Sequence, residues 1–407
     1  MKDENTWVGT WASAQYAIPQ SDPRAPVLKD STFRQMIRVS LGGEKLRFTF
    51  SNEYGESPVE IKSAAIAKPT VIRQSNIDTA TSRFLSFNGG KESITIEAGK
   101  KAVSDEIEYP VKALDKIALS VYFGNTPETL THHGASRSNG FLKKGNAVAD
   151  EIAEDEVSKE TVLTSWYFLC NTDVLSDSSS SRSIICFGDS ITDGYGTEQP
   201  APDILPDSYL RWVDVFMEKL SANPAMSGLS VINMGIGGNA IFGGQGQAAK
   251  DRFDRDVLEQ CGAGYLIFLI GVNDILFSPG TDPSLPDRMI EEYGKMISKA
   301  NAAGIKVLAG TITPMYGSQG HTDAKEAMRQ KVNNWLSDSY KEGKVAALVD
   351  FANHIAVTED GKSRIKDIYD RDGLHPGIAG YRAMGELVYE VFEKSLRASS
   401  PFGLPVP

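Results

Sequence analysis

The second half of the chain alternates short apolar runs with amphipathic segments, and this alternation restricts the fold more than any other feature. The apolar runs, each short enough for a buried strand, are residues 184–187, 230–234, 265–270, 306–311 and 345–351. The amphipathic segments that follow the strands are residues 209–220, 248–259, 286–303, 324–340 and 378–396. A helix after each strand returns the chain to the same end of the sheet, so the pattern predicts a parallel sheet with helices on both faces. We therefore expect an α/β domain over residues 184–398.

The first half has a different pattern, with many short strand-like runs and little helical periodicity. Residues 33–40 and 45–51 are two such runs, and the segment Leu41-Gly42-Gly43-Glu44 between them is typical of a β-hairpin. Further expected strands are residues 59–67, 93–97, 116–123 and 165–169. Clusters of Gly, Pro and Asn separate them. This pattern predicts an all-β domain, a sandwich or jelly-roll-like fold, over residues 1–176.

Two segments of low complexity mark the ends of these domains. Residues 177–183 read Asp-Ser-Ser-Ser-Ser-Arg-Ser, a polar composition that is typical of a linker. Residues 399–407 are short and rich in proline, so we expect a loosely attached tail there.

The overall composition excludes some classes of partner. The 407 residues carry a formal net charge of −11, and 41% hydrophobic and 23% charged residues are ordinary values for a globular protein. An acidic chain repels phosphates and anionic membrane surfaces, so we expect no nucleic-acid partner. No apolar run approaches the ~20 residues of a membrane span, and no apolar signal-peptide core follows Met1. As written, the sequence predicts a cytoplasmic protein, or a secreted one if a leader was removed, and it leaves the oligomeric state open.

Neither a metal nor a cofactor is expected. The three cysteines have no paired spacing and predict neither a disulfide framework nor a zinc site: Cys170, Cys186 and Cys261. His132 and His133 are adjacent, and neighbouring residues of a strand point to opposite faces, which is poor chelating geometry. The sequence of residues 244–249 matches a dinucleotide-binding fingerprint. The segment does not directly follow an expected strand, as that fingerprint requires, so it does not predict a cofactor site.

Four short segments carry the residues that indicate chemistry. They are Gly188-Asp189-Ser190-Ile191-Thr192-Asp193-Gly194, Asn233-Met234-Gly235-Ile236-Gly237-Gly238-Asn239, Gly271-Val272-Asn273-Asp274 and Asp372-Gly373-Leu374-His375-Pro376. The first three follow the first three expected strands, and the fourth precedes the last helix. Ligands of open α/β sheets bind at the carboxyl ends of the strands, so we expect all four segments at one edge.

The residue types in these segments fit acyl transfer. Ser190 is the candidate nucleophile, His375 the base that takes its proton, and Asp372, three residues earlier, the group that orients the imidazole. The expected oxyanion donors are the backbone N–H groups of Ser190 and Gly238 and the side-chain amide of Asn273. No Gly-x-Ser-x-Gly surrounds Ser190, which argues against the α/β-hydrolase elbow.

These segments resemble the four blocks of the SGNH (GDSL-type) hydrolases, whose Ser, Gly, Asn and His match Ser190, Gly238, Asn273 and His375. The resemblance implies a flavodoxin-like, three-layer α/β/α domain from about residue 184. In the first half, residues 7–13 and Leu41-Gly42-Gly43 look like the β-domain of a two-domain branch of this family. That branch is described as acyl esterases, some of them associated with plant polysaccharides.

The resemblance implies a cofactor-free esterase of short acyl groups, acetyl first, with a sugar or another polar alcohol as the leaving group. A lipase- or phospholipase-like activity on longer chains is the alternative within enzymes. A carbohydrate-binding protein without turnover is the alternative from another class. The first domain is expected to shape substrate access rather than to supply chemistry. Asp189, Asp193, Asp274 and Asp370 are expected to have turn or cap roles.

Overall fold

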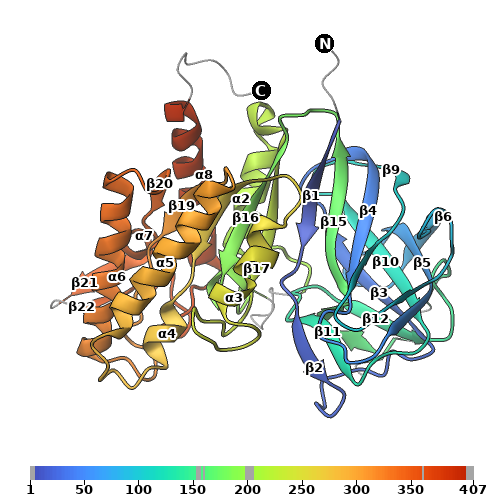
Figure 1. Ribbon diagram of the computed structural model, residues 1–407, viewed down its shortest axis with the longest axis horizontal. Coiled ribbons are helices and arrows are strands. Elements are labelled where there is room, and N and C mark those ends of the chain that lie inside the picture. The colour runs from blue at the N-terminus through green and yellow to red at the C-terminus, as the bar shows by residue number, and fades with distance from the viewer. Residues whose placement is uncertain (1–4, 153–156, 159–160, 198–205, 360–361, 400–407) are drawn as a thin grey trace. The chain divides into compact units, whose positions relative to one another are not determined.

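The computed structural model describes residues 5–152, 157–158, 161–197, 206–359 and 362–399 (Figure 1). The chain divides into two compact units. The first comprises Met1–Ser179 and Glu198–Ser208, and the second comprises Ser180–Thr197 and Tyr209–Pro407. Apart from Ser399, the expected tail lies outside the described residues.

The first unit is built from antiparallel strands. One sheet has the order β1-β15-β4-β8, and β9 also pairs with β4. A second sheet has the order β13-β12-β3-β10-β5-β6, and β7 also pairs with β5. A third sheet has the order β14-β11-β2. The strands are β1 (Thr6–Ala12), β2 (Tyr16–Pro19), β3 (Ser31–Arg38), β4 (Gly43–Ser51), β5 (Val59–Pro69), β6 (Ile77–Phe84), β7 (Ile94–Ile96), β8 (Lys101–Val103), β9 (Ile107–Val111), β10 (Lys116–Phe123), β11 (Thr129–Gly134), β12 (Gly140–Lys144), β13 (Val162–Leu163), β14 (Ser165–Tyr167) and β15 (Leu169–Ser176). The prediction of an all-β first half is confirmed.

The two larger sheets of this unit share one apolar core. Phe48 and Phe50 of β4 belong to the same fully buried cluster as Phe33 of β3 and Phe123 of β10. Strands of this kind bury alternate side chains because successive residues point to opposite faces of a sheet. In β4 the residues Leu46, Phe48 and Phe50 follow that alternation.

The hairpin prediction was wrong. β3 pairs with β10 and β12, whereas β4 pairs with β15, β8 and β9, so the two strands lie in different sheets. A Cβ on Gly42 would lie 2.6 Å from the carbonyl oxygen of Val111, and one on Gly43 would lie 2.4 Å from that of Leu175. The two glycines therefore let the chain pass close to other backbone as it changes sheets, and they do not form a two-strand turn.

The second unit contains a five-stranded parallel sheet in the order β17-β16-β18-β19-β20. Its strands are β16 (Arg182–Gly188), β17 (Leu229–Gly235), β18 (Ala263–Leu269), β19 (Lys306–Gly310) and β20 (Ala347–Val349). β16 begins at Arg182, so the last two residues of the expected linker belong to the strand. The prediction of a parallel sheet in this half is confirmed. The chain reverses its direction of travel across the sheet after β17, which places the switch in strand order between β16 and β18.

The helices of this unit form two groups that pack among themselves and against the sheet (Figure 1). One group contains α2 (Trp212–Ser221), α7 (Phe351–Ile355) and α8 (Ile378–Ser399), and the other contains α3 (Ala249–Phe253), α4 (Val272–Leu276), α5 (Leu285–Ala302) and α6 (Asp323–Lys341). The remaining elements are α1 (Ser190–Asp193), the 3₁₀ turn η2 (Pro224–Met226), the π-helical turn η3 (Asp254–Leu258) and the hairpin of β21 (Ala356–Glu359) and β22 (Lys362–Ile365). None of the described helices is long and apolar enough to cross a membrane.

One short segment returns to the first unit after α1. In the described part of it, the backbone N–H of Asp207 donates to the carbonyl of Arg137 at 2.7 Å, and Arg73 Nε donates to the carbonyl of Pro206 at 2.8 Å. Asp207 also accepts a hydrogen bond from the backbone of Asn139. The alternation of strands and helices did not predict this excursion, because the contacts that hold it are made with loops far away in sequence.

Candidate active site

The candidate nucleophile lies in a tight strand-to-helix turn. β16 ends at Gly188, and the Asp189 side chain caps α1 by accepting the backbone N–H of Ile191 at 3.0 Å. A Cβ on Gly188 would lie 2.2 Å from the carbonyl oxygen of Leu269 and 2.3 Å from Thr192 Oγ1. The turn therefore requires glycine at this position, and it places Ser190 at the first position of α1.

Ser190, His375 and Asp372 form a continuous chain of hydrogen bonds. Ser190 Oγ lies 2.9 Å from His375 Nε2, and His375 Nδ1 lies 3.0 Å from Asp372 Oδ2. Asp372 Oδ1 accepts the backbone N–H groups of His375 at 2.8 Å and of Leu374 at 3.1 Å. Burial raises the pKa of Asp372, but the hydrogen bonds and charge of His375 outweigh it and hold the pKa below its ordinary value. The carboxylate is therefore ionised at neutral pH and fixed as an acceptor for Nδ1.

Gly238 lies in the loop that follows β17, and Asn273 lies in the first turn of α4, shortly after β18. Gly238 has a φ of 70°, in the region that favours glycine, and this bends the chain directly after β17. Asn273 is buried, and its Nδ2 donates to the carbonyl of Asn239 at 2.8 Å. That bond uses one of the two amide hydrogens, so the second is the candidate donor to an oxyanion. The first N–H groups of a helix have no acceptor within it, which leaves that of Ser190 as another candidate donor.

Three residues that the sequence patterns did not indicate form a cluster beside the imidazole of His375. The ring of Tyr195, just beyond α1, lies against the imidazole of His375 with centroids 4.3 Å apart. The guanidinium of Arg371 lies 5.4 Å from the centroid of the Tyr195 ring. Its Nη1 donates to the carbonyl of Gly196 at 3.1 Å. The hydroxyl of Tyr381 donates to the carbonyl of Tyr195. Only the adjacency of Arg371 to Asp372 could have pointed to this cluster.

Three other aspartates in or beside the four segments, Asp189, Asp274 and Asp370, make turn and cap contacts. Asp274 accepts the backbone N–H groups of Ile241 at 2.8 Å and Phe242 at 3.1 Å, and Asp370 accepts that of Gly373 at 2.9 Å. Burial raises the pKa of Asp274 to about 6. Burial also raises the pKa of Asp189 to about 7, and the nearby charge of Asp274 adds to the effect.

The raised pKa of Asp189 predicts a pH-dependent effect of Asp189→Asn on stability. Between the ordinary value of 3.8 and about 7, the folded protein keeps a proton that the unfolded chain releases, so stability falls as pH rises through this window. Asparagine does not ionise, and its Oδ1 can still accept from Ile191. The variant should therefore gain stability relative to the wild type from pH 4.5 to pH 8, by about 1.4 kcal/mol for each pH unit between 4.5 and about 7. Urea unfolding at both pH values measures this, and an equal stability difference at both would contradict it.

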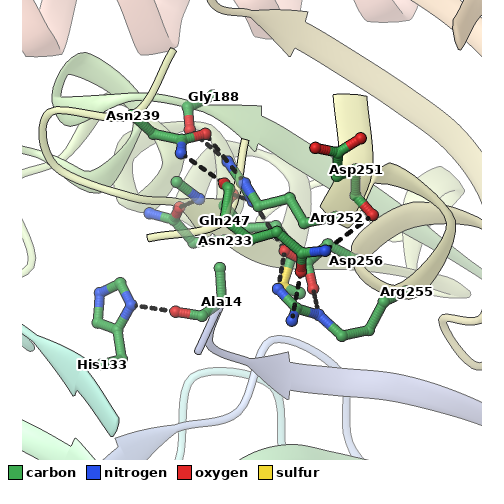
Figure 2. A network of polar contacts seen from close by, with 12 residues as sticks. Ala14, His133, Gly188, Asn233, Asn239, Gln247, Asp251, Arg252, Arg255 and Asp256 are labelled. Carbon is green, nitrogen blue, oxygen red and sulfur yellow. Dashed lines mark hydrogen bonds and ion pairs between the residues drawn. The ribbon is translucent and has the colours of Figure 1, made fainter. Parts of the chain in front are cut away.

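The residues considered for metal binding do not come together. In the described part of the chain, no group of three or more His, Cys, Asp or Glu side chains is arranged to hold a metal ion. In the first unit, His133 Nδ1 donates to the carbonyl of Ala14 at 2.6 Å (Figure 2). Both ring nitrogens of His132 are buried without a hydrogen-bond partner, and burial lowers its pKa to about 3. Its imidazole is therefore neutral at physiological pH.

Residues 186–383 match the GDSL-like Lipase/Acylhydrolase family. No curated protein matches the chain. Among solved structures, a putative acylhydrolase from Bacteroides fragilis is 23% identical, with 54% of this chain and 90% of that chain covered and a TM-score of 0.41. A carbohydrate acetylesterase from Sinorhizobium meliloti is 17% identical, with 53% and 100% covered and a TM-score of 0.39. An acetyl xylan esterase from Geobacillus stearothermophilus is 19% identical, with 53% and 95% covered and a TM-score of 0.39.

The matched residues contain the segments that carry Ser190, Gly238, Asn273 and His375. The resemblance seen in the sequence is thereby confirmed: residues 186–383 form a GDSL-like lipase/acylhydrolase domain.

Proposed function

We propose that this protein hydrolyses short-chain carboxylic esters through an acyl-enzyme on Ser190. The observation that supports it best is the unbroken series of hydrogen bonds from Ser190 Oγ through His375 to Asp372. A serine hydroxyl becomes nucleophilic when a base takes its proton, and His375 Nε2 is within hydrogen-bond distance of that proton. Asp372 keeps the proton of the neutral imidazole on Nδ1, so that Nε2 is free to accept.

The reaction then has two halves. Ser190 Oγ attacks the acyl carbonyl as His375 takes its proton, and the tetrahedral intermediate collapses when His375 gives that proton to the leaving alcohol. Water next attacks the acyl-enzyme as His375 takes its proton, and the second tetrahedral intermediate collapses when His375 gives that proton to Ser190 Oγ, which releases the acid and restores the enzyme. In both halves the oxyanion is stabilised by the backbone N–H groups of Ser190 and Gly238 and by Asn273 Nδ2.

The flavodoxin-like, three-layer arrangement remains part of this proposal. The strand order β17-β16-β18-β19-β20 supports it, because numbering these strands along the chain gives 2-1-3-4-5. In that order the loops after β16 and β18 flank the switch point. Ser190 follows the first of these strands and Asn273 the second, which is where a substrate is expected to bind.

The preferred substrates are acetyl esters with a sugar or another polar alcohol, on the strength of the two-domain branch that the sequence resembles. An esterase of longer acyl chains is the second candidate. In its favour, two exposed aromatic side chains follow the oxyanion donors closely in sequence: Phe242, 38% exposed, and Phe277, 76% exposed, at the end of α4. Each is four residues beyond its donor, Gly238 or Asn273.

A series of p-nitrophenyl esters from acetate to decanoate separates the two candidates. We expect kcat/KM to be highest for acetate and to fall by about tenfold or more by octanoate, and acetylated saccharides to be deacetylated. A pocket that excludes one additional methylene discriminates by roughly 1–3 kcal/mol, so a short pocket gives a steep profile. A maximum at octanoate or beyond that is lost in Phe242→Ser would establish the second candidate instead.

The role proposed for the first unit is accessory. All of the candidate catalytic residues and oxyanion donors belong to the second unit. We expect alanine variants at exposed polar side chains of the first unit to change the ratio between small and bulky esters and to leave the acetate rate intact. Unchanged ratios across such a panel would exclude this role. A carbohydrate-binding protein without turnover would show no ester hydrolysis that depends on Ser190.

A further inference from the structure

A buried arginine binds the strand ends and the loop that precede or carry the candidate oxyanion donors. Arg252 in α3 has a fully buried side chain, and each nitrogen of its guanidinium is used (Figure 2). Nε donates to Asn239 Oδ1 at 3.0 Å, and Nη2 donates to the carbonyl of Gly188 at 2.9 Å. Nη1 donates to the carbonyl of Met234 at 2.9 Å and to Asp256 Oδ2 at 2.8 Å. Three of these four acceptors belong to the strand ends and loop that carry the site.

Two of the acceptors lie at the carboxyl ends of neighbouring strands, so Arg252 links these two ends. Gly188 is the last residue of β16, and Met234 is next to last in the adjacent parallel strand β17. Ser190 follows Gly188 by two residues, and Gly238 follows Met234 by four. The guanidinium is a planar fork with donors at fixed angles, so it sets the spacing of the two carbonyls that it holds. That spacing determines how the N–H groups of Ser190 and Gly238 are aimed.

The third acceptor, Asn239 Oδ1, connects Arg252 to the third candidate oxyanion donor, the amide of Asn273. Asn239 directly follows Gly238, and its Nδ2 donates to the carbonyls of Gln245 and Gln247, both at 2.8 Å. Its backbone carbonyl accepts Asn273 Nδ2 at 2.8 Å. Arg252 thus holds the side chain of Asn239, and the backbone carbonyl of Asn239 orients the amide of Asn273.

The charge of Arg252 is balanced without involving the reacting groups. Asp256 is also fully buried, and the pKa of its carboxyl is lowered because Arg255 and Arg252 outweigh the effect of burial. Arg255 binds the same carboxylate through Nε at 2.5 Å and Nη2 at 3.0 Å. The ring of Phe187 lies 4.1 Å from the Arg252 guanidinium. A buried ion pair contributes little net stability compared with apolar side chains, so the geometry of the fork is the better reason for an arginine here.

We propose that Arg252 is a positioning residue that aligns all three oxyanion donors by tying the ends of β16 and β17 to the Asn239 loop. This inference rests on the proposed esterase function. It predicts that loss of the fork weakens binding of the transition state and leaves binding of the ester in its ground state almost unchanged.

Arg252→Lys tests the proposal, with Arg255→Lys as the matched control. Lysine at 252 keeps a positive charge beside Asp256 but cannot reach the three site acceptors together. We expect kcat for p-nitrophenyl acetate, per active site titrated to completion with an organophosphate, to fall about 10²-fold, with KM changed less than about threefold. Affinity for a phenylboronic acid, which forms a tetrahedral adduct on serine, should fall in parallel. The control variant keeps the contacts of Arg252, and its kcat should stay within about threefold of the wild type.

Partial unfolding lowers the fraction of titrated sites rather than the rate of each site, so it does not imitate the expected result. A kcat per titrated site within threefold of the wild type in Arg252→Lys, or an equal loss in both variants, overturns the proposal. If Arg252→Lys yields no titratable protein, Asn239→Ala interrupts the same connection one step later and must meet the same criterion. Absence of Ser190-dependent hydrolysis in the wild type would instead overturn the proposed function itself.

Discussion

Ser190→Ala is expected to lower kcat for p-nitrophenyl acetate by about 10⁶-fold, leaving only the slow reaction that binding and the oxyanion donors promote. The reason is that Oγ, 2.9 Å from His375 Nε2, is the atom that forms the acyl-enzyme, and alanine has no such atom. The side chain is small and buried, and its hydroxyl caps no helix, so the change should leave the fold intact. The rate is measured at pH 8 together with the fraction of protein that an organophosphate labels.

Ser183→Ala is the matched control for this variant. Ser183 lies near the start of β16, the strand that leads to Ser190, and is also buried, but its hydroxyl donates to the carbonyl of Cys261 at the opposite end of that strand. Activity of this control should stay within about threefold of the wild type. Full activity of Ser190→Ala, or an organophosphate adduct found on another residue by mass spectrometry, would refute the assignment of the nucleophile.

Asp372→Asn is expected to lower kcat by about 10³- to 10⁴-fold with little effect on KM. Two backbone N–H groups hold Asp372 Oδ1, so in the variant this position keeps the carbonyl oxygen of the amide. The amide nitrogen then replaces Oδ2, opposite His375 Nδ1. Two donors cannot face each other, so the imidazole is forced to carry its proton on Nε2. In that tautomer it cannot accept the proton of Ser190. Steady-state kinetics across pH 6–9 measures the loss.

Asp370→Asn provides the control, because it makes the same substitution two residues earlier. Asp370 accepts the backbone N–H of Gly373 through Oδ1 alone, a bond that asparagine can keep. Its kcat should remain within about threefold of the wild type. A kcat for Asp372→Asn as high as that of this control would show that the carboxylate does not orient His375, and would remove Asp372 from the proposed mechanism.

The sequence by itself determined the class of each half and the residues of the candidate site. The spacing of apolar residues within each segment is a local property of the chain, so the sequence indicates which segments are strands and which are helices. The alternation of strands and helices in the second half then predicts a parallel sheet. The position of Ser190 after β16 and of Asn273 after β18 followed from the same pattern, since parallel strands end at one edge. Asp372 and His375 are three residues apart, so their pairing is local as well.

The tertiary structure alone decided which segments meet across long distances in the chain. The run Leu41-Gly42-Gly43-Glu44 has the letters of a hairpin, yet β3 and β4 pair with other strands, because strand partners are chosen by the packing of whole sheets. The ring of Tyr195 contacts the imidazole of His375, which is 180 positions later in the chain. A contact of this kind leaves no local pattern in the sequence.

Arg252 is the clearest case of a residue whose contacts could not be predicted from the sequence. In the sequence it is one charged residue in an amphipathic segment, where the ordinary expectation is an exposed side chain. The structure buries it completely, because the carbonyls of Gly188 and Met234 and the side chain of Asn239 converge where two strands and a loop come together. Local periodicity specifies the elements of this protein, whereas a buried polar group finds its acceptors only after those elements have packed.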